Sequence, residues 1–364
     1  MEASIQSEQS QEVVSDPHPS MTIKWGSATR VVRSRPSVWE KAKSNVCAMD
    51  RDPVAHDVMV AQIETIGHHS RMEIDNGRKI TLYPGDLIGV VFGHRYATRQ
   101  FYGIVPPASG TYDVLSQGGV CGRYLSGPSE MKTPTIIRPL GYLVDDLKRV
   151  INLRDFAHRP VAATPNVNTI IVVGSSMDAG KTTLAAGIVQ GLHRAGKHVN
   201  AGKITGTACV KDTFRMLDAG ARKVMDFSEV GFASTFNCSS EELIDICDTL
   251  ITNLSADSPD YLVLEIADGI IQTETRLVLD YLSRISRLEH LALAVHDAMA
   301  APTCIEMLRS QWNAEVTVVS GLATITPLSK AELQSLVTPP CWSQEELIRP
   351  DVESLFPLIL TSAE

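Results

Sequence analysis

The stretch that decides the fold is IIVVGSSMDAGKTT, residues 170–183. Four apolar residues lead into Gly174, and the sequence LAAGIVQGLHRAG that follows Thr183 has the apolar spacing of a helix. We align Gly174 and Gly180 with the two glycines of the phosphate-binding pattern G-x-x-x-x-G-K-[ST]. A β-branched strand, a glycine-containing loop and a helix in this order predict a phosphate-binding site at the carboxyl end of a strand.

The residue types in this loop suit a bound phosphate. Gly174 and Gly180 let the backbone curl so that its N–H groups point inward. Lys181 supplies a mobile cation for the β- and γ-phosphates, and the hydroxyl of Thr182 can ligate Mg²⁺. The residues expected to surround the nucleotide are Gly174, Ser175, Ser176, Met177, Asp178, Ala179, Gly180, Lys181, Thr182 and Thr183.

The composition excludes several classes of protein. Of 364 residues, 44% are hydrophobic, which is ordinary for a globular chain of two domains, or of one large domain with an appendage. The net charge of −9 and the lack of a Lys/Arg block argue against a nucleic-acid partner. No apolar run approaches the roughly 18 residues of a membrane span, and none of the 7 cysteines is spaced as C-x-x-C. We therefore expect a cytoplasmic protein with no nucleic-acid and no membrane partner.

Changes of pattern along the chain predict three parts. Residues 1–50, rich in Ser, Gln and Pro at their start, are interpreted as a disordered or extended arm. Residues 51–150 are interpreted as a small β-barrel domain with a connecting helix, DDLKRVINLRDFA. A linker, HRPVAATPNVN, then leads into a nucleotide-binding domain over residues 160–364.

Short strands and turns dominate the predicted barrel. Asn76-Gly77 between RMEID and RKITLY is a strong hairpin signal. The glycine- and arginine-rich stretches 93–100 and 116–123 are either an anion or substrate site or ordinary barrel turns. The adjacent His68 and His69 would point to opposite faces of a strand, so we favour hydrogen-bonded or solvated histidines over a metal site.

Beyond residue 160, strands alternate with helices, which predicts an α/β fold with a mostly parallel sheet. Carboxylates that hold Mg²⁺ should then lie where strands end, next to the phosphate loop. Glu265 ends the apolar run DYLVLE, and Asp212 begins a helix just after the second strand. We expect Thr182, Asp212 and Glu265 to ligate the metal, with Asp268 as an alternative carboxylate in the same turn.

Two further charged residues are expected to act in catalysis together with Lys181. Lys203 closes the strand HVNAGK and should point into the active-site crevice, near the γ-phosphate or an anionic substrate. Asp178 lies inside the phosphate loop, where an acid repels phosphates unless it contacts a cation or an amine. We interpret Asp178 as a contact to the substrate or to a water on Mg²⁺.

Residues 168–325 resemble dethiobiotin synthetase and the wider group that includes cobyrinate synthase and MinD-like proteins. The resemblance is carried by Asp178, by the lysine of AGKITG, by Asp212 and by the segment LEIADG. It implies that Lys203 contacts the substrate and the phosphate, and that Asp212 and Glu265 ligate Mg²⁺. The sequence departs from that family at Ile204 and Ile266, and it lacks the asparagine that the family places after a late strand.

The resemblance implies an ATP- and Mg²⁺-dependent enzyme of ligase or kinase type that acts on an anionic small-molecule acceptor, and it implies a homodimer. The alternative is a MinD-like switch ATPase that binds a protein partner. That group has a signature lysine after the first loop glycine, where this chain has Ser175, so the sequence favours the enzyme. A third interpretation is a ligand sensor without catalysis.

Overall fold

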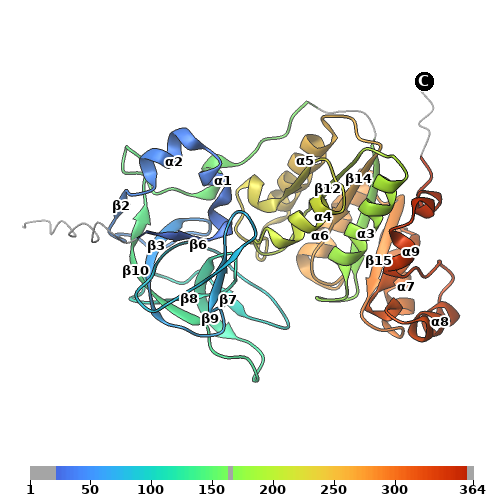
Figure 1. The fold of residues 1–364 in the computed structure, drawn as a ribbon, viewed down its shortest axis with the longest axis horizontal. Coiled ribbons are helices and arrows are strands. Elements are labelled where there is room, and N and C mark those ends of the chain that lie inside the picture. Colours follow the sequence, from blue (N-terminus) through green and yellow to red (C-terminus); the bar gives the residue numbers. More distant parts are fainter. Residues whose placement is uncertain (1–21, 163–166, 359–364) are drawn as a thin grey trace, which may run out of the picture.

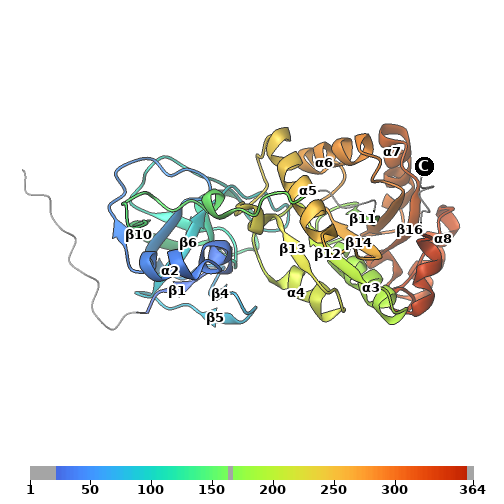
Figure 2. The ribbon, with the colours of Figure 1, turned by 90° about the horizontal axis from the view of Figure 1, so that it is seen from above.

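The computed structural model describes residues 22–162 and 167–358, which form a β-rich N-terminal half and an α/β C-terminal half (Figures 1 and 2). Residues 1–21 of the predicted arm and residues 163–166 of the predicted linker lie outside the described residues. Within the described parts, no helix is long and apolar enough to cross a membrane.

The N-terminal half is built on eight strands that pair in one sheet, with a separate two-stranded hairpin. The strands are β1 (Lys24–Trp25), β2 (Val46–Cys47), β3 (Val58–Thr65), β4 (Arg71–Glu73), β5 (Lys79–Thr81), β6 (Leu87–Phe92), β7 (Tyr102–Ile104), β8 (Tyr112–Val114), β9 (Val120–Ser126) and β10 (Thr135–Leu143). The sheet order is β1-β6-β3-β10-β8-β9-β7, and β2 pairs with β10. Because β6 also pairs with β9, strands β6, β3, β10, β8 and β9 form a closed ring of pairings.

The predicted hairpin at Asn76-Gly77 is confirmed, because β4 and β5 pair antiparallel on either side of it. The stretch 116–123 is only partly a loop. From Val120 onward it belongs to β9, whose first two residues, Val120 and Cys121, are fully buried. The sequence prediction stopped short of this strand because the glycines on either side suggested a turn.

Two sequence interpretations of this half are wrong. Residues 22–50 are not a disordered arm, since they form β1, β2, α1 (Arg30–Arg33) and α2 (Pro36–Ala42), with Val31 and Val32 fully buried. The predicted connecting helix is also absent. There, Asp145 accepts hydrogen bonds from the N–H groups of Leu147 and Arg149 and closes a turn, and only a 3₁₀ segment, η2 (Leu153–Phe156), follows. The amphipathic spacing was real, but local capping by Asp145 favoured a turn.

The C-terminal half is a six-stranded, all-parallel sheet with the order β13-β12-β14-β11-β15-β16. Its strands are β11 (Asn168–Gly174), β12 (Val199–Lys203), β13 (Val224–Asp226), β14 (Tyr261–Glu265), β15 (His290–Val295) and β16 (Val316–Gly321). The helices are α3 (Lys181–Arg194), α4 (Lys211–Asp218), α5 (Ser240–Ser255), α6 (Thr273–Arg284), α7 (Ala300–Trp312), α8 (Pro327–Leu336) and α9 (Gln344–Leu347), followed by a 3₁₀ segment, η5 (Pro350–Leu355). The predicted parallel α/β fold is confirmed.

Helices cover both faces of this sheet, as a parallel sheet requires (Figure 2). One face packs against α3, α4 and the C-terminal segments α9 and η5. The other packs against α5, α6 and α7. The register places Lys203 beside Glu265 at the carboxyl ends of β12 and β14, next to the end of β11. The sheet therefore gathers the phosphate loop and two charged side chains at one edge.

The two halves share one buried apolar cluster. Val31 and Val32 of α1 belong to the same cluster as Val230 and Phe232 of the C-terminal half. The 3₁₀ segment η3 (Phe227–Val230) contacts both α1 and η2. Burial of apolar side chains thus fixes the β-rich half against the segment 227–233.

Candidate functional site

The phosphate loop connects β11 to α3. Lys181, at the first turn of α3, is 6% exposed, and its ammonium donates to the carbonyl of Ser176 at 2.8 Å. Gly180 has φ +103, which disfavours any side chain, and a Cβ on Gly174 would lie 2.8 Å from the stem of Lys181. The two glycines therefore allow the lysine to fold back across the loop.

The spacing in this loop corrects the sequence alignment. Five residues, not four, separate Gly174 from Gly180, so the first position of the pattern G-x-x-x-x-G-K-[ST] is Ser175. Counted back from Gly180, the position of the switch-group lysine becomes Ser176, which is again a serine. The structure retains the strand, loop and helix that the pattern requires.

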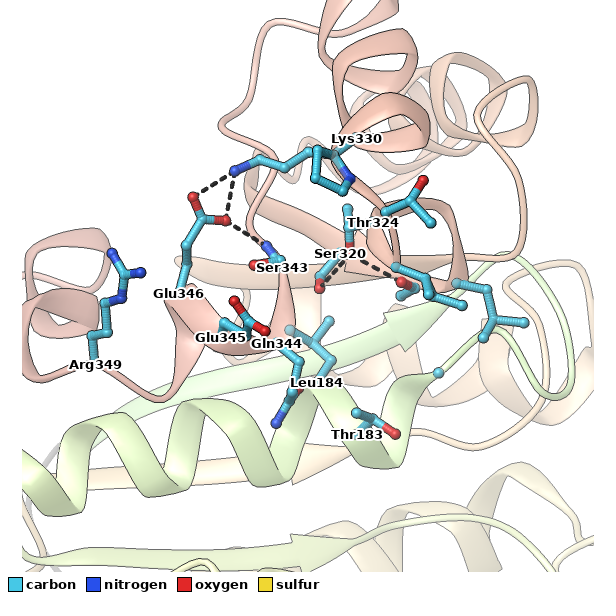
Figure 3. Close-up of a pocket in the computed structure, with 16 residues that line it drawn as sticks. Thr183, Leu184, Ser320, Thr324, Lys330, Ser343, Gln344, Glu345, Glu346 and Arg349 are labelled. Atoms are coloured by element: carbon cyan, nitrogen blue, oxygen red, sulfur yellow. Dashed lines mark hydrogen bonds and ion pairs between the residues drawn. The ribbon is translucent and has the colours of Figure 1, made fainter.

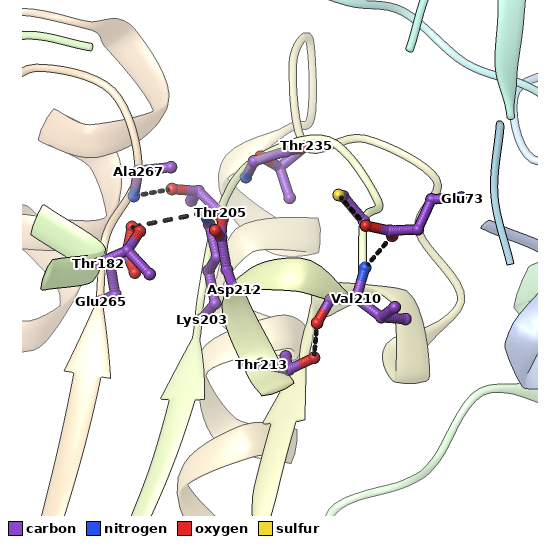
Figure 4. A network of polar contacts seen from close by, with 12 residues as sticks. Glu73, Thr182, Lys203, Thr205, Val210, Asp212, Thr213, Thr235, Glu265 and Ala267 are labelled. Carbon is purple, nitrogen blue, oxygen red and sulfur yellow. Dashed lines mark hydrogen bonds and ion pairs between the residues drawn. The ribbon is translucent and has the colours of Figure 1, made fainter. Parts of the chain in front are cut away.

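Lys203 lies between two carboxylates (Figure 4). Its ammonium forms an ion pair with Oδ2 of Asp212 and another with Oε1 of Glu265, at 3.3 Å. Glu265 is 1% exposed. The structure thus brings Lys203, Asp212 and Glu265 together, as the sequence predicts. In the structure, however, the lysine forms ion pairs with the two predicted metal ligands themselves.

The residues fit a bound Mg²⁺. The hydroxyl of Thr182 donates to Oε1 of Glu265 at 3.0 Å, while Oε2 of Glu265 is buried without a hydrogen-bond partner. An unsatisfied buried carboxylate oxygen is costly unless a cation or donor binds it. No cluster of three or more His, Cys, Asp or Glu suited to a metal occurs among the described residues. One hydroxyl and two carboxylates are nevertheless a usual set for Mg²⁺, which retains several waters.

Charge and burial compete in this network. Burial lowers the pKa of Lys203, but the charges of Asp212 and Glu265 outweigh it and raise that pKa well above its usual value. Burial raises the pKa of Asp212, but Lys203 outweighs it and the net shift is downward. Burial also lowers the pKa of Lys181 and raises that of Asp268, which follows β14 with φ +64. Lys203 and Asp212 are therefore both charged near neutral pH.

Two cavities open on either side of Gly180. The first, of about 360 Å³, is lined by Lys181, Thr182, Lys203 and the acidic side chains around them, including Asp178 and Asp268. Asp178 is exposed, with φ +61. The predicted catalytic and metal residues thus line a single cavity.

The second cavity, of about 610 Å³, lies between the loop after β16 and α9 (Figure 3). Lys330 donates to both carboxylate oxygens of Glu346 at 2.5 Å, and Arg349 lines the same wall. Lys330, Glu346 and Arg349 were not singled out from the sequence, because their segments were interpreted only as helices at the end of the chain. The polar run SQEEL after a Pro-Pro turn was the available signal.

A residue of the β-rich half also reaches this site. Glu73 of β4 is 1% exposed, and its carboxylate accepts from the N–H of Val210 at 2.6 Å and from Sγ of Cys209 at 3.1 Å (Figure 4). Val210 is the N-cap of α4, whose first turn carries Asp212. Glu73 therefore holds the beginning of the helix that positions a predicted metal ligand. The sequence gave no signal for this, because the contact joins residues 137 positions apart.

His69 forms a hydrogen bond within the β-rich half, which is the arrangement that the sequence analysis favours. Nε2 of His69 lies 3.1 Å from the carbonyl of Leu115, and burial lowers its pKa to about 3. His68 packs edge-on against His69 and Phe101. These side chains are part of the packing of the β-rich half.

Comparisons with known proteins give no family. No family model matches the chain, and no curated protein is similar to it. Among solved structures, a ParA family ATPase from Chlorobium tepidum TLS is similar over 52% of this chain and 93% of its own, with 13% identity and a TM-score of 0.33.

Two further solved structures are similar to this chain. The cell division protein ftsY from Thermotoga maritima has 16% identity over 54% of this chain and 70% of its own, with a TM-score of 0.37. The signal recognition particle 54 kDa protein from Aeropyrum pernix K1, in complex with GDP, has 18% identity over 53% of this chain and 49% of its own, with a TM-score of 0.35. At TM-scores below 0.5 these likenesses assign no activity. On its own loop, sheet and site geometry, the C-terminal half of the chain has the fold of a P-loop NTPase.

Proposed function

We propose that this protein is a Mg²⁺-dependent nucleoside triphosphatase, with ATP as the preferred nucleotide, whose nucleotide state is transmitted to its β-rich half. The sequence placed second a MinD-like switch ATPase that binds a protein partner; the proposal keeps the nucleotide switch and makes the β-rich half the part that responds. The observation that carries it is the continuous network from Glu73 through the beginning of α4 to Asp212, Lys203, Glu265 and Thr182 (Figure 4).

The two cavities suit the two ends of a nucleotide. The N–H groups of the phosphate loop and Lys181 would bind the β- and γ-phosphates in the smaller cavity. The larger cavity, which shares Gly180 and Thr183 with the first, would take the ribose and base. Thr182, Asp212 and Glu265 would hold Mg²⁺, which supplies positive charge to the γ-phosphate.

Binding at this site changes the partners of Lys203. In the structure its ammonium is paired with both carboxylates that would hold the metal. If Asp212 and Glu265 held a divalent cation, Lys203 would lose both carboxylate partners and its ammonium would turn toward the phosphates. Asp212 lies in the first turn of α4, so its movement would shift the beginning of that helix, and Glu73 would transmit the shift to the hairpin of β4 and β5. This path is the physical basis of the proposed switch.

The test is hydrolysis together with hydrogen exchange. We expect the full chain to hydrolyse ATP with Mg²⁺, and Lys181→Ala to lose nucleotide binding or turnover, because a charge-assisted contact in a partly desolvated site contributes about 2–4 kcal/mol. ATP with Mg²⁺ and ADP should give different amide exchange in α4 and in the β4–β5 hairpin. Hydrolysis with identical exchange in both states would leave an ATPase but refute the switch.

A second candidate is phosphoryl transfer to an anionic small molecule, as the resemblance to dethiobiotin synthetase implies. The observation that favours it is Lys203, a second cation in a cavity where Lys181 already serves the phosphates. Lys203→Met removes the charge and keeps most of the stem. In this case ATP affinity should change little, while turnover with the acceptor falls roughly 10²-fold. Equal loss of ATP binding in Lys203→Met and Lys181→Ala would place Lys203 in the nucleotide cradle instead.

The homodimer remains a proposal in either case. Sedimentation of the full chain with and without ATP and Mg²⁺ tests it, and a monomer in both conditions would contradict it. A small-molecule acceptor would be tested separately, by screening anionic compounds for stimulation of ATP turnover.

A further inference from the structure

The stretch 93–100 of the β-rich half extends across to the phosphate loop. The hydroxyl of Thr98 lies 3.9 Å from Sδ of Met177, a residue of that loop. The guanidinium of Arg99 donates to Nε2 of His296 at 3.1 Å. Because a guanidinium only donates, this ring nitrogen is the acceptor of the hydrogen bond. The stretch therefore places an arginine at the rim of the nucleotide site.

The position of this stretch is set by both halves of the chain. Arg95 is 6% exposed and donates to the carbonyl of Leu115 and to the side chain of Gln100, each at 2.5 Å. The ring of Tyr96 stacks on Phe236 of the C-terminal half, with centroids 5.2 Å apart. These contacts hold the backbone around Arg99 in place, while the side chain of Arg99 itself is exposed.

Both contacts of the stretch lie against the phosphate loop. Met177 lines the 360 Å³ cavity together with Lys181. The N–H of His296 donates to Oγ of Ser175 at 3.1 Å, so His296 packs against the first half of the loop. To reach the cavity that Met177 lines, the long Arg99 side chain would release His296 and rotate toward the phosphate loop.

The charge of Arg99 has no opposite partner. Within residues 22–162 and 167–358 its guanidinium forms no ion pair, whereas Lys203 is neutralised by Asp212 and Glu265. An imidazole nitrogen is a weak partner for a guanidinium compared with a phosphate oxygen, which it can bind with two parallel N–H groups. A γ-phosphate would therefore compete well for Arg99.

We infer that Arg99 is a catalytic residue that the β-rich half supplies to the nucleotide site, where its guanidinium binds the γ-phosphate of the triphosphate. The inference rests on the proposed hydrolysis. In that reaction the bond from the γ-phosphorus to the bridging oxygen breaks, and its electron pair stays on the diphosphate. A water oxygen bonds to the phosphorus, and a water proton is released. Arg99 stabilises the charge on the γ-oxygens during this transfer.

The experiment compares Arg99→Ala and Arg99→Lys with Arg123→Ala in the full chain. Arg123 is an exposed arginine on β9 of the same half and serves as the matched control. We expect kcat for ATP hydrolysis to fall about 10²-fold or more in both Arg99 variants, because lysine lacks the planar fork. The Kd of a non-hydrolysable ATP analogue should rise, while the Kd of ADP should stay unchanged because ADP has no γ-phosphate. Arg123→Ala should match the wild type in every measurement.

Two results would overturn the inference. One is turnover in Arg99→Ala equal to that in Arg123→Ala. The other is an equal loss of affinity for ADP and for the ATP analogue, which would make Arg99 a general support of the loop. Thermal unfolding of each variant confirms that the comparison is between folded proteins, and Arg99→Lys covers the case in which the alanine variant is unstable. A wild-type chain that binds no ATP would instead refute the proposed function itself.

Discussion

At the scale of the residue, Glu265 performs two tasks. One of its oxygens accepts from Thr182 and faces Lys203, and the other is buried without a partner. We expect Glu265→Gln to keep the fold, because the amide is nearly isosteric, and to weaken Mg²⁺-dependent turnover, because the amide has no charge to hold the ion. The measurement is a Mg²⁺ titration of ATP turnover. Superimposable titrations for variant and wild type would show that Glu265 is not a ligand.

The charged residues of the site were open to prediction from the sequence, and their pairing was not. Lys203 and Glu265 each close an apolar strand, and parallel strands end at one edge of a sheet. That Lys203 forms ion pairs with both carboxylates depends on side-chain positions that no pattern encodes. The sequence offered the stretch 93–100 as an anion or substrate site, but it gave no signal for the contact of Arg99 with His296 or of Glu73 with Val210, since each joins residues more than a hundred positions apart.

At the scale of the element, α4 depends on a carboxylate from the other half of the chain. Glu73 accepts from the N–H of Val210, where the positive end of the helix dipole lies. Glu73→Gln keeps the shape but removes the charge, and we expect it to weaken the beginning of α4 by about 1–2 kcal/mol. Faster amide exchange in α4 and a weaker apparent affinity for Mg²⁺ would be measured together.

The control for that variant is Glu64→Gln, at an exposed position of β3. It removes the same charge from the same half without touching α4. If both variants exchange at the wild-type rate in α4, Glu73 does not hold this helix.

The amphipathic stretch 145–157 shows how local contacts can override the spacing of apolar residues. Its apolar spacing predicted a helix, yet a single capping aspartate and a bridge between Val144 and Val150 produced a turn.

At the scale of the whole molecule, His56 makes the association of the halves depend on pH. Its Nδ1 accepts from the N–H of Ala233 at 3.1 Å, and burial lowers its pKa to about 4. Between pH 6.5 and 4 the unfolded chain therefore binds a proton at His56 more readily than the folded chain does. The contribution of His56 to the free energy of unfolding is complete above pH 6.5 and is lost as the pH falls toward 4. The loss amounts to about 3 kcal/mol for one such group.

The matched variant is His56→Asn, whose side-chain oxygen can accept the same hydrogen bond and which tolerates the φ of +76 at this position. Its free energy of unfolding should fall less than that of the wild type between pH 6.5 and 4. Glu229 also titrates at this boundary, because burial raises its pKa to about 7. Its contribution is the same in both proteins, so it cancels when their two pH curves are subtracted. Parallel pH curves for the two proteins would contradict the role given to His56.

The shared apolar cluster also bears on the domain boundary near residue 160. A fragment of residues 160–364 would expose Val230, Phe232 and Ala233, which are at most 1% exposed in the full chain. We expect this fragment to unfold at a lower temperature than the full chain and to aggregate more readily. Equal melting temperatures and equal ATP affinities would show that the boundary is a true domain boundary.

The position of the segment 227–233 matters during synthesis as well. Val31 and Val32 cannot complete their burial until this segment has left the ribosome. At roughly 5–20 residues per second, the stretch from residue 160 to 233 takes on the order of several seconds to be made. During that time the nascent N-terminal half presents an uncovered apolar surface, which is the kind of surface that chaperones bind. The N-terminal half therefore cannot complete the burial of its apolar surface until the segment 227–233 has been synthesised.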